Sequence, residues 1–222
     1  MKAVAVIPSY NEAATVGSVA QEVQKYVDMV IVVDDGSKDN THSTLQQLAK
    51  ANGKIIALHH EINLGKGAAL KTGCDAALAL GADYIVCLDA DHQHTPHSIP
   101  QFIEALQKQN DVVFGIRQLN NRMPLVLLLG NKFLSIVINA LFHVLVHDTQ
   151  SGFRAFTSRA YDKLRWKSTG YEVETEMIVR MSQHELRYGE VDIDTIYHDG
   201  YKGTTALDGI KIFGQILKWK LL

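Results

Sequence analysis

Short apolar runs alternate with amphipathic segments along the first half of the chain. The largely apolar runs predict buried strands at residues 3–7, 29–33, 54–58, 84–88 and 111–115. Helical spacing of apolar side chains predicts helices at residues 13–27, 41–51, 68–80 and 98–107. Such alternation produces βαβ units with right-handed crossovers, so the carboxyl ends of the strands meet at one sheet edge. We therefore expect an α/β fold with a Rossmann-like, mostly parallel sheet flanked by helices.

The strand at residues 84–88 runs into Asp89-Ala90-Asp91. Residues i and i+2 of an extended chain point the same way, so both carboxylates project together from the strand end. Two close carboxylates repel each other unless a cation lies between them, and Mg²⁺ commonly joins carboxylates to phosphate oxygens. The pair thus suggests a metal-bridged diphosphate, although Asp91 also suits a helix N-cap. Thr95-Pro96 has the simpler interpretation of a helix start.

Polar residues follow three other strands of the same predicted sheet. These are the loops at residues 10–12 and 34–37, and Arg117. Placing Asp35 beside Asp89 and Asp91 would cost several kcal/mol unless a cation and hydrogen-bond donors compensate. The convergence therefore predicts a site for a nucleotide and a metal ion.

Two nearby features have competing interpretations. Gly65-Lys66-Gly67 matches neither the Walker motif nor the dinucleotide fingerprint. A tight turn into a closely packed helix and a backbone contact with a ligand explain it equally well. The histidines at positions 92, 94 and 97 lack regular zinc-ligand spacing. We expect His94 to line a polar pocket and the other two to be solvated.

Two segments in the second half have unusually wide apolar faces. Residues 125–146 carry a polar stripe of Lys132, Ser135, Asn139 and His143 in an otherwise apolar helix pattern. Residues 207–222 combine lysines with a broad apolar face and a tryptophan near the end. For each segment, burial in the core or a subunit contact competes equally with a membrane interface.

Composition narrows the class of protein. The 222 residues suit one fairly large domain, and the net charge of −2 argues against general nucleic-acid binding. Cys74 and Cys87 lie in apolar surroundings, which is typical of reduced core residues in a cytoplasmic protein. The N-terminal run is too short for a signal peptide, and no apolar run reaches the length of a spanning helix.

Charged residues recur after the long apolar segment. Asp148 and Arg154 in the polar loop predict a charged pair beside a ligand pocket, or a salt bridge that fixes the loop. Glu172, Glu174 and Glu176 open the next predicted helix, where acidic side chains suit the helix dipole.

The motifs together resemble glycosyltransferase family 2, and within it the dolichyl-phosphate mannose and glucose synthase group. The resemblance covers residues 3–200 and rests on Pro-Ser-Tyr-Asn-Glu from position 8, Val-Asp-Asp-Gly-Ser from 33, Asn-Leu-Gly-Lys-Gly from 63, Asp-Ala-Asp-His-Gln-His-Thr-Pro from 89, and Ser-Gly-Phe-Arg from 151. It implies a GT-A fold, an inverting mechanism and a nucleotide-sugar donor. We expect a catalytic domain at residues 1–205 and an amphipathic C-terminal helix at 206–222.

The resemblance assigns roles to individual positions. It implies that the nucleotide pocket and donor site comprise Pro8, Tyr10, Glu12, Val33, Asp35, Asp89, Ala90, Asp91, Arg117 and Lys202. Asp91, Gln93 and Asp89 would hold Mg²⁺ or Mn²⁺, with Asp89 chiefly contacting the donor. Asp89, Asp91 and Arg117 would be the catalytic residues. Candidates for the acceptor phosphate are Arg117, Arg122, Lys132 and Arg154, because guanidinium forks suit phosphate oxygens.

The implied reaction moves mannose or glucose from a GDP-mannose or UDP-glucose type donor to a polyprenyl phosphate. Such an acceptor would place the enzyme in the cytoplasm, peripherally attached to a membrane. The family's downstream arginine is absent near Lys202, and Asn131 replaces a common arginine, which weakens the choice of mannose. Two alternatives are transfer to a hydroxyl with Glu174 or Glu176 as base, and a non-catalytic nucleotide-sugar binding module.

Overall fold

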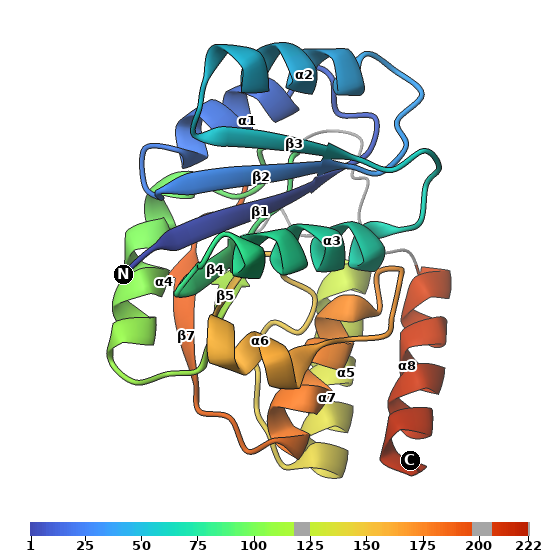
Figure 1. Cartoon of the computed structure of the whole chain (residues 1–222). Coiled ribbons are helices and arrows are strands. Elements are labelled where there is room, and N and C mark those ends of the chain that lie inside the picture. The colour runs from blue at the N-terminus through green and yellow to red at the C-terminus, as the bar shows by residue number, and fades with distance from the viewer. Residues whose placement is uncertain (118–124, 197–205, 222) are drawn as a thin grey trace.

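A seven-stranded mixed sheet forms the centre of the molecule (Figure 1). We describe a computed structural model over residues 1–117, 125–196 and 206–221. The sheet order is β3-β2-β1-β4-β6-β5-β7. The strands are β1 (Ala3–Ser9), β2 (Met29–Asp34), β3 (Ile55–His59), β4 (Tyr84–Cys87), β5 (Val112–Arg117), β6 (Arg154–Thr157) and β7 (Tyr188–Ile193).

Strand β6 runs opposite to the other strands. It pairs antiparallel with β4 and β5, whereas β1, β2, β3 and β4 pair in parallel, as do β5 and β7. The six parallel strands therefore end at one edge of the sheet, and β6 begins there. The prediction of a mostly parallel α/β sheet is confirmed.

Helices cover both faces of this sheet (Figure 1). One face carries α1 (Val16–Val23), α2 (Thr41–Ala51) and α4 (Ile99–Gln107), whose apolar residues join a core cluster with Ala5 and Ile7. The other face carries α3 (Lys66–Ala79), α5 (Leu125–Phe142), α6 (Ser158–Leu164), α7 (Val173–Gln183) and α8 (Ala206–Leu221). Val4 and Val6 point to that second cluster, as the alternation of side chains along a strand requires.

Most predicted elements of the first half are present. Helix α2 has the predicted bounds, whereas α1 is shorter than residues 13–27. Pro96 begins a short 3₁₀ helix, η1 (Pro96–Ser98), that leads into α4, as its position predicts. Cys74 and Cys87 are buried and free, with their sulfur atoms 3.9 Å apart.

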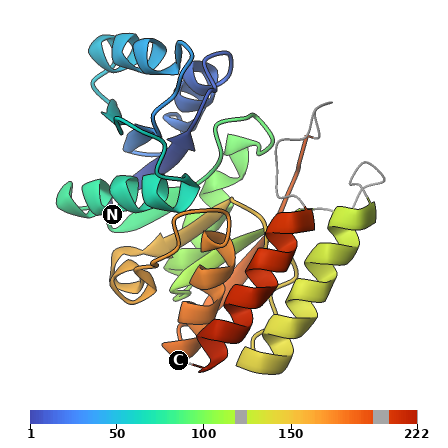
Figure 2. The ribbon, with the colours of Figure 1, turned by 90° about the vertical axis from the view of Figure 1, so that its right-hand side faces the viewer.

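Helices α5 and α8 lie side by side, and each has one buried and one exposed apolar side (Figure 2). Their inner sides belong to the core, through Leu134, Ile138 and Phe142 of α5 and Ile212 and Ile216 of α8. Ser135 of the predicted polar stripe is also buried. Their outer sides expose Leu129, Phe133 and Ile136 of α5 and Ile210, Leu217 and Leu221 of α8. Among residues 1–117, 125–196 and 206–221, no helix combines the length and apolar character needed to cross a membrane.

Candidate active site

The largest set of predicted site residues surrounds one pocket at the carboxyl edge of the sheet. The pocket has a volume of about 430 Å³. Its lining comes from the ends of five strands and the segments after them, from the loop before β6, and from the start of α7 with the residues before it. It includes Pro8, Ser9, Tyr10, Glu12, Asp35, Asn63, Gly65, Lys66, Asp89, Ala90, Asp91, Gln93, His94, Arg117, Gln150, Gly152, Tyr171 and Glu174. The structure thus brings together the loops whose convergence the sequence predicts.

Lys66 forms the ionic centre of this pocket. Its Nζ lies 2.7 Å from Asp89 Oδ1 and 2.8 Å from Glu174 Oε1. Burial alone would lower the pKa of Lys66, but the two carboxylates outweigh burial and raise it, so the ammonium stays charged. The same contact keeps the pKa of Asp89 low despite burial, with a smaller contribution from His94. Asp89 is therefore an ionised carboxylate that already has a positive partner.

Asp91 is in a different electrostatic state from Asp89. Its side chain is half-buried and accepts a hydrogen bond of 3.0 Å from the backbone N–H of Gln93. Burial, and then the nearby charge of Asp89, raise the pKa of Asp91. This carboxylate would gain stability from a cation beside it, so the oxygen donors at Asp89, Asp91 and Gln93 fit a hard divalent ion.

His94 lies where the sequence predicts, on the wall of the pocket. Its ring is buried, and its Nε2 lies 3.8 Å from Asp89 Oδ2. Burial lowers the pKa of His94 to about 4, so the ring is neutral at pH 7. His92 instead approaches Ser18 Oγ at 2.7 Å, and His97 approaches Asp194 at 4.0 Å. His97 is exposed as expected, whereas His92 is half-buried beside Ser18 and not fully solvated.

Arg117 is held in place by Asp148. Its Nε donates to Asp148 Oδ2 at 2.6 Å and its Nη2 donates to Oδ1 at 2.9 Å. Asn131 of α5 donates to the same carboxylate at 2.9 Å. Burial opposes ionisation of Asp148, but Arg117 outweighs burial and lowers its pKa. The sequence-based pairing of Asp148 with Arg154 is wrong, because β5 places Arg117 beside Asp148.

Arg154 is a structural residue in this fold. Its side chain is 1% exposed, and its guanidinium donates to the backbone carbonyls of Ser151, Glu174 and Thr149. It also stacks over the Phe114 ring. Arg154 is buried against these carbonyls and does not line the pocket, so its assignment to the acceptor phosphate is corrected.

The remaining predicted residues have varied positions. The side chain of Val33 is buried in the core and does not line the pocket, which corrects its assignment to the nucleotide pocket as far as the side chain is concerned. Lys132 is exposed on α5 and is not among the lining residues. Arg122 and Lys202 lie outside the described residues.

Asp35 and the glycine loop form one wall together. Asp35 accepts hydrogen bonds from the N–H groups of Leu64 and Gly65 at 3.0 and 2.8 Å. Gly65 has a φ of 97°, and a Cβ there would collide with the carbonyl of Thr169. The glycines therefore serve a tight turn with close packing, while Lys66 between them reaches the pocket. The interpretation as a tight turn is confirmed, and a backbone contact with a ligand stays a prediction.

The segment before β6 approaches Asp89 closely. A Cβ on Gly152 would overlap the Asp89 carboxylate, so only glycine fits there without a shift.

Glu176 in contrast faces away from the pocket lining. Its carboxylate accepts from the N–H groups of Lys167 and Ser168 and pairs with Arg180 at 2.6 Å. Glu176 thus fixes the loop that packs on Gly65, a structural role that adds to the helix-dipole position expected from the sequence.

Sequence reasoning did not identify several lining residues. Lys66 follows β3, so the rule of converging strand ends could have included it. Gln150, Gly152 and Tyr171 carry no comparable signal, because their place depends on how β6 and α7 pack.

Comparison with known proteins agrees with this geometry. Residues 4–165 match the model of the family described as glycosyl transferase family 2. A protein of Methanococcus voltae named UDP-N-acetylglucosamine–dolichyl-phosphate N-acetylglucosaminyltransferase is 36% identical, over 97% of this chain and 95% of its own length. A dolichyl-phosphate beta-glucosyltransferase of Trichomonas vaginalis is 27% identical, over 97% of this chain and 75% of its own length.

Solved structures show the same fold. Glucosyl-3-phosphoglycerate synthase from Mycobacterium tuberculosis, in complex with Mn²⁺, uridine diphosphate and phosphoglyceric acid, superposes with a TM-score of 0.76. Its sequence is 20% identical, and the match covers 99% of this chain and 78% of that one. The arrangement of the sheet is therefore that of GT-A glycosyltransferases. The family match over most of the chain, with the close relative of nearly equal length, establishes that this protein is a glycosyltransferase of family 2.

Proposed function

We propose that the protein transfers a sugar from a nucleotide-diphosphate sugar to a polyprenyl phosphate at a membrane surface. The observation that carries the proposal is the presence of Asp89, Asp91 and Arg117 in one pocket. Both substrates of the proposed reaction are anions. The acids suit a cation that binds the diphosphate of the donor, and the arginine suits the phosphate of the acceptor. The names of the relatives support dolichyl phosphate as the type of acceptor.

The two ends of the pocket suit different parts of the donor. Pro8, Tyr10, Glu12 and Asp35 lie on the β1 and β2 side, where the nucleoside would bind. Asp91, Gln93 and Asp89 would hold Mg²⁺ or Mn²⁺ beside the diphosphate. When bound, such an ion neutralises the charge that develops on the departing diphosphate.

The proposed acceptor needs no general base. A phosphate monoester already carries negative oxygens at pH 7, so it can attack the anomeric carbon directly. Arg117 would orient that phosphate, because Asp148 fixes its guanidinium through Nε and Nη2. The hydroxyl-acceptor alternative has weaker support, since Glu174 is paired with Lys66 and Glu176 is turned toward Lys167 and Arg180.

The identity of the transferred sugar and of the nucleotide in the donor can be tested directly. We expect transfer of N-acetylglucosamine or glucose from a uridine-linked donor in preference to transfer from GDP-mannose. The name of the Methanococcus voltae relative gives UDP-N-acetylglucosamine as its donor, and the name of the Trichomonas vaginalis relative gives glucose as the sugar. Purified protein would be incubated with Mn²⁺, each radiolabelled donor, and either dolichyl phosphate, undecaprenyl phosphate or a glycan acceptor. Label in the lipid phase supports the proposal. Label only in the glycan would favour the hydroxyl acceptor, and donor binding without any transfer would favour the binding module.

The outer sides of α5 and α8 are the proposed contact with the membrane. Ile136 is 67% exposed and Ile210 is 70% exposed. Apolar side chains that gather on two adjacent helices suit insertion into the headgroup boundary, and nearby lysines suit anionic lipids.

Replacing both isoleucines with glutamate is expected to weaken binding to anionic vesicles by on the order of a hundredfold, since burying each is worth about 1.5–3 kcal/mol. Vesicle flotation measures this effect. Ile62→Glu is the matched control, because Ile62 is 66% exposed but lies between β3 and α3. Equal flotation of the double variant and the control would contradict the assignment of this surface.

A further inference from the structure

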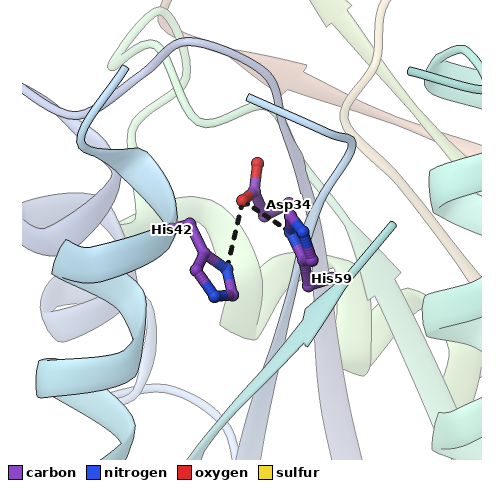
Figure 3. A group of neighbouring side chains, drawn as sticks. All are labelled: Asp34, His42 and His59. Atoms are coloured by element: carbon purple, nitrogen blue, oxygen red, sulfur yellow. Dashed lines mark hydrogen bonds and ion pairs between the residues drawn. The ribbon is translucent and has the colours of Figure 1, made fainter. Parts of the chain in front are cut away.

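We propose that Asp34, His42 and His59 form a second metal site, for Zn²⁺ or a similar transition-metal ion, outside the donor pocket. The three side chains converge from the end of β2, the first turn of α2 and the end of β3 (Figure 3). None of them lines the donor pocket.

The distances between the donor atoms suit a tetrahedral ion. Asp34 Oδ2 lies 3.0 Å from His59 Nδ1 and 3.4 Å from His42 Nδ1. All three donor atoms lie within 4.8 Å of one another. Zinc bonds of about 2.0–2.2 Å place tetrahedral ligand atoms about 3.3–3.5 Å apart, so small side-chain shifts would complete the geometry.

The surroundings hold these side chains in place. Asp34 and His59 are paired residues of neighbouring parallel strands, so the backbone fixes their separation. The second carboxylate oxygen of Asp34 accepts from the N–H of Ser37 at 3.1 Å. Nε2 of His42 lies 2.8 Å from the side-chain amide of Gln46, a contact that can orient the ring of a metal-bound histidine once the amide presents its oxygen.

Charge gives an independent reason for a cation here. Asp34 is completely buried, and the ion pairs described for it are with His42 and His59 alone. Neutral imidazoles would leave a buried anion balanced by hydrogen bonds only. The side chains of His42 and His59 are 39% and 30% exposed, which leaves access for an ion and for a water molecule as its fourth ligand.

The donor set also defines the class of metal. Two imidazole nitrogens and one carboxylate favour Zn²⁺, Co²⁺, Ni²⁺ or Cu²⁺, whereas the oxygen ligands at Asp91 favour Mg²⁺ or Mn²⁺. The two sites would therefore select different ions. Because Asp34 precedes Asp35, whose carboxylate holds Leu64 and Gly65, an ion at Asp34 would also stiffen one wall of the donor pocket.

The test uses the full chain, stripped of metal by a chelator and titrated with Co²⁺. We expect one Co²⁺ per chain to show the strong visible absorption of a tetrahedral site and to be displaced by Zn²⁺ but not by Mg²⁺. A Co²⁺ ion held by the oxygen donors at Asp91 would absorb only weakly and would be displaced by Mg²⁺. His42→Ala and His59→Gln should each weaken binding by roughly tenfold or more, as loss of a metal ligand does. His97→Ala and Asp162→Asn are matched controls that remove a histidine and an exposed acid away from both metal sites, and they should bind Co²⁺ as the native chain does.

Thermal unfolding gives a second measurement that does not depend on activity. Zn²⁺ should raise the Tm of the native chain and of His97→Ala, but not that of His42→Ala, since an ion stabilises only the state that binds it. Circular dichroism checks that the variants fold. Absence of the visible bands, or equal Co²⁺ affinity in the native chain and both ligand variants, would overturn the proposal. Co²⁺ binding and Tm are both measured without any sugar transfer. The outcome of this test is therefore independent of whether the proposed transferase function is correct.

Discussion

Replacing Asp91 with asparagine is expected to remove nearly all sugar transfer and to leave the fold intact. Asparagine keeps the shape of the side chain but removes the charge that a divalent ion requires. Such an ion contributes several kcal/mol to stabilising the leaving group, so we expect kcat to fall by about a thousandfold. The measurement is transfer to the lipid acceptor over a range of Mn²⁺ concentrations.

The stability of this variant distinguishes loss of the ion from loss of the fold. The pKa of Asp91 is raised by burial and by Asp89, so in the metal-free protein its contribution to stability falls as the pH rises through the folded-state pKa. Asparagine does not ionise, so the variant does not lose this stability as the pH rises. The metal-free variant should therefore have a Tm at pH 7 equal to or above that of the native chain. Asp162→Asn, at an exposed position on α6, is the control and should change neither property. Full activity of Asp91→Asn would refute the assigned role.

Replacing Arg117 with lysine is expected to lower kcat by roughly a hundredfold, similar to the loss of one preorganised donor in other sites. The guanidinium donates two bonds to Asp148, and Arg117 lines the pocket. A lysine keeps the charge but cannot reproduce this planar fork. The measurement is kcat and KM for donor and acceptor separately.

Two further variants make the Arg117 result specific. Asp148→Asn should lower kcat in the same direction, because the guanidinium loses the charged partner that orients it. Arg165→Lys alters an arginine that is paired with Asp75 at 2.9 Å on the surface, and should leave transfer unchanged. If Arg117→Lys kept near-native kcat with both substrates, Arg117 would have no part in orienting a phosphate.

The fold was largely predictable because its strands and helices have clear hydrophobic periods. Strands β1, β2 and β4 are almost wholly buried, so their sequences are continuous apolar runs. Strand β7 lies at the sheet edge and is mostly half-buried, which removes that signal. Helix α6 is only seven residues long, too short for a helical period to stand out.

The candidate site was predictable only where strand order decides position. Asp35, Asp89, Asp91 and Arg117 meet because parallel strands end at one edge. The choice between Arg117 and Arg154 as partner of Asp148 depends on the reversed direction of β6, which no local pattern encodes. The contact between Lys66 and Glu174 likewise depends on how the segment before α7 packs against the start of α3.

The position of Lys66 links the binding of the two components of the donor site. Before any ligand arrives, its ammonium is shared between Asp89 and Glu174. A diphosphate that binds alone would be repelled by these two carboxylates and by Asp91, whereas a divalent ion that binds alone would be repelled by the ammonium of Lys66. Each ligand lowers the electrostatic barrier to the other, and such coupling is reciprocal. Cation and nucleotide should therefore bind cooperatively, so that the affinity for either one depends on the concentration of the other.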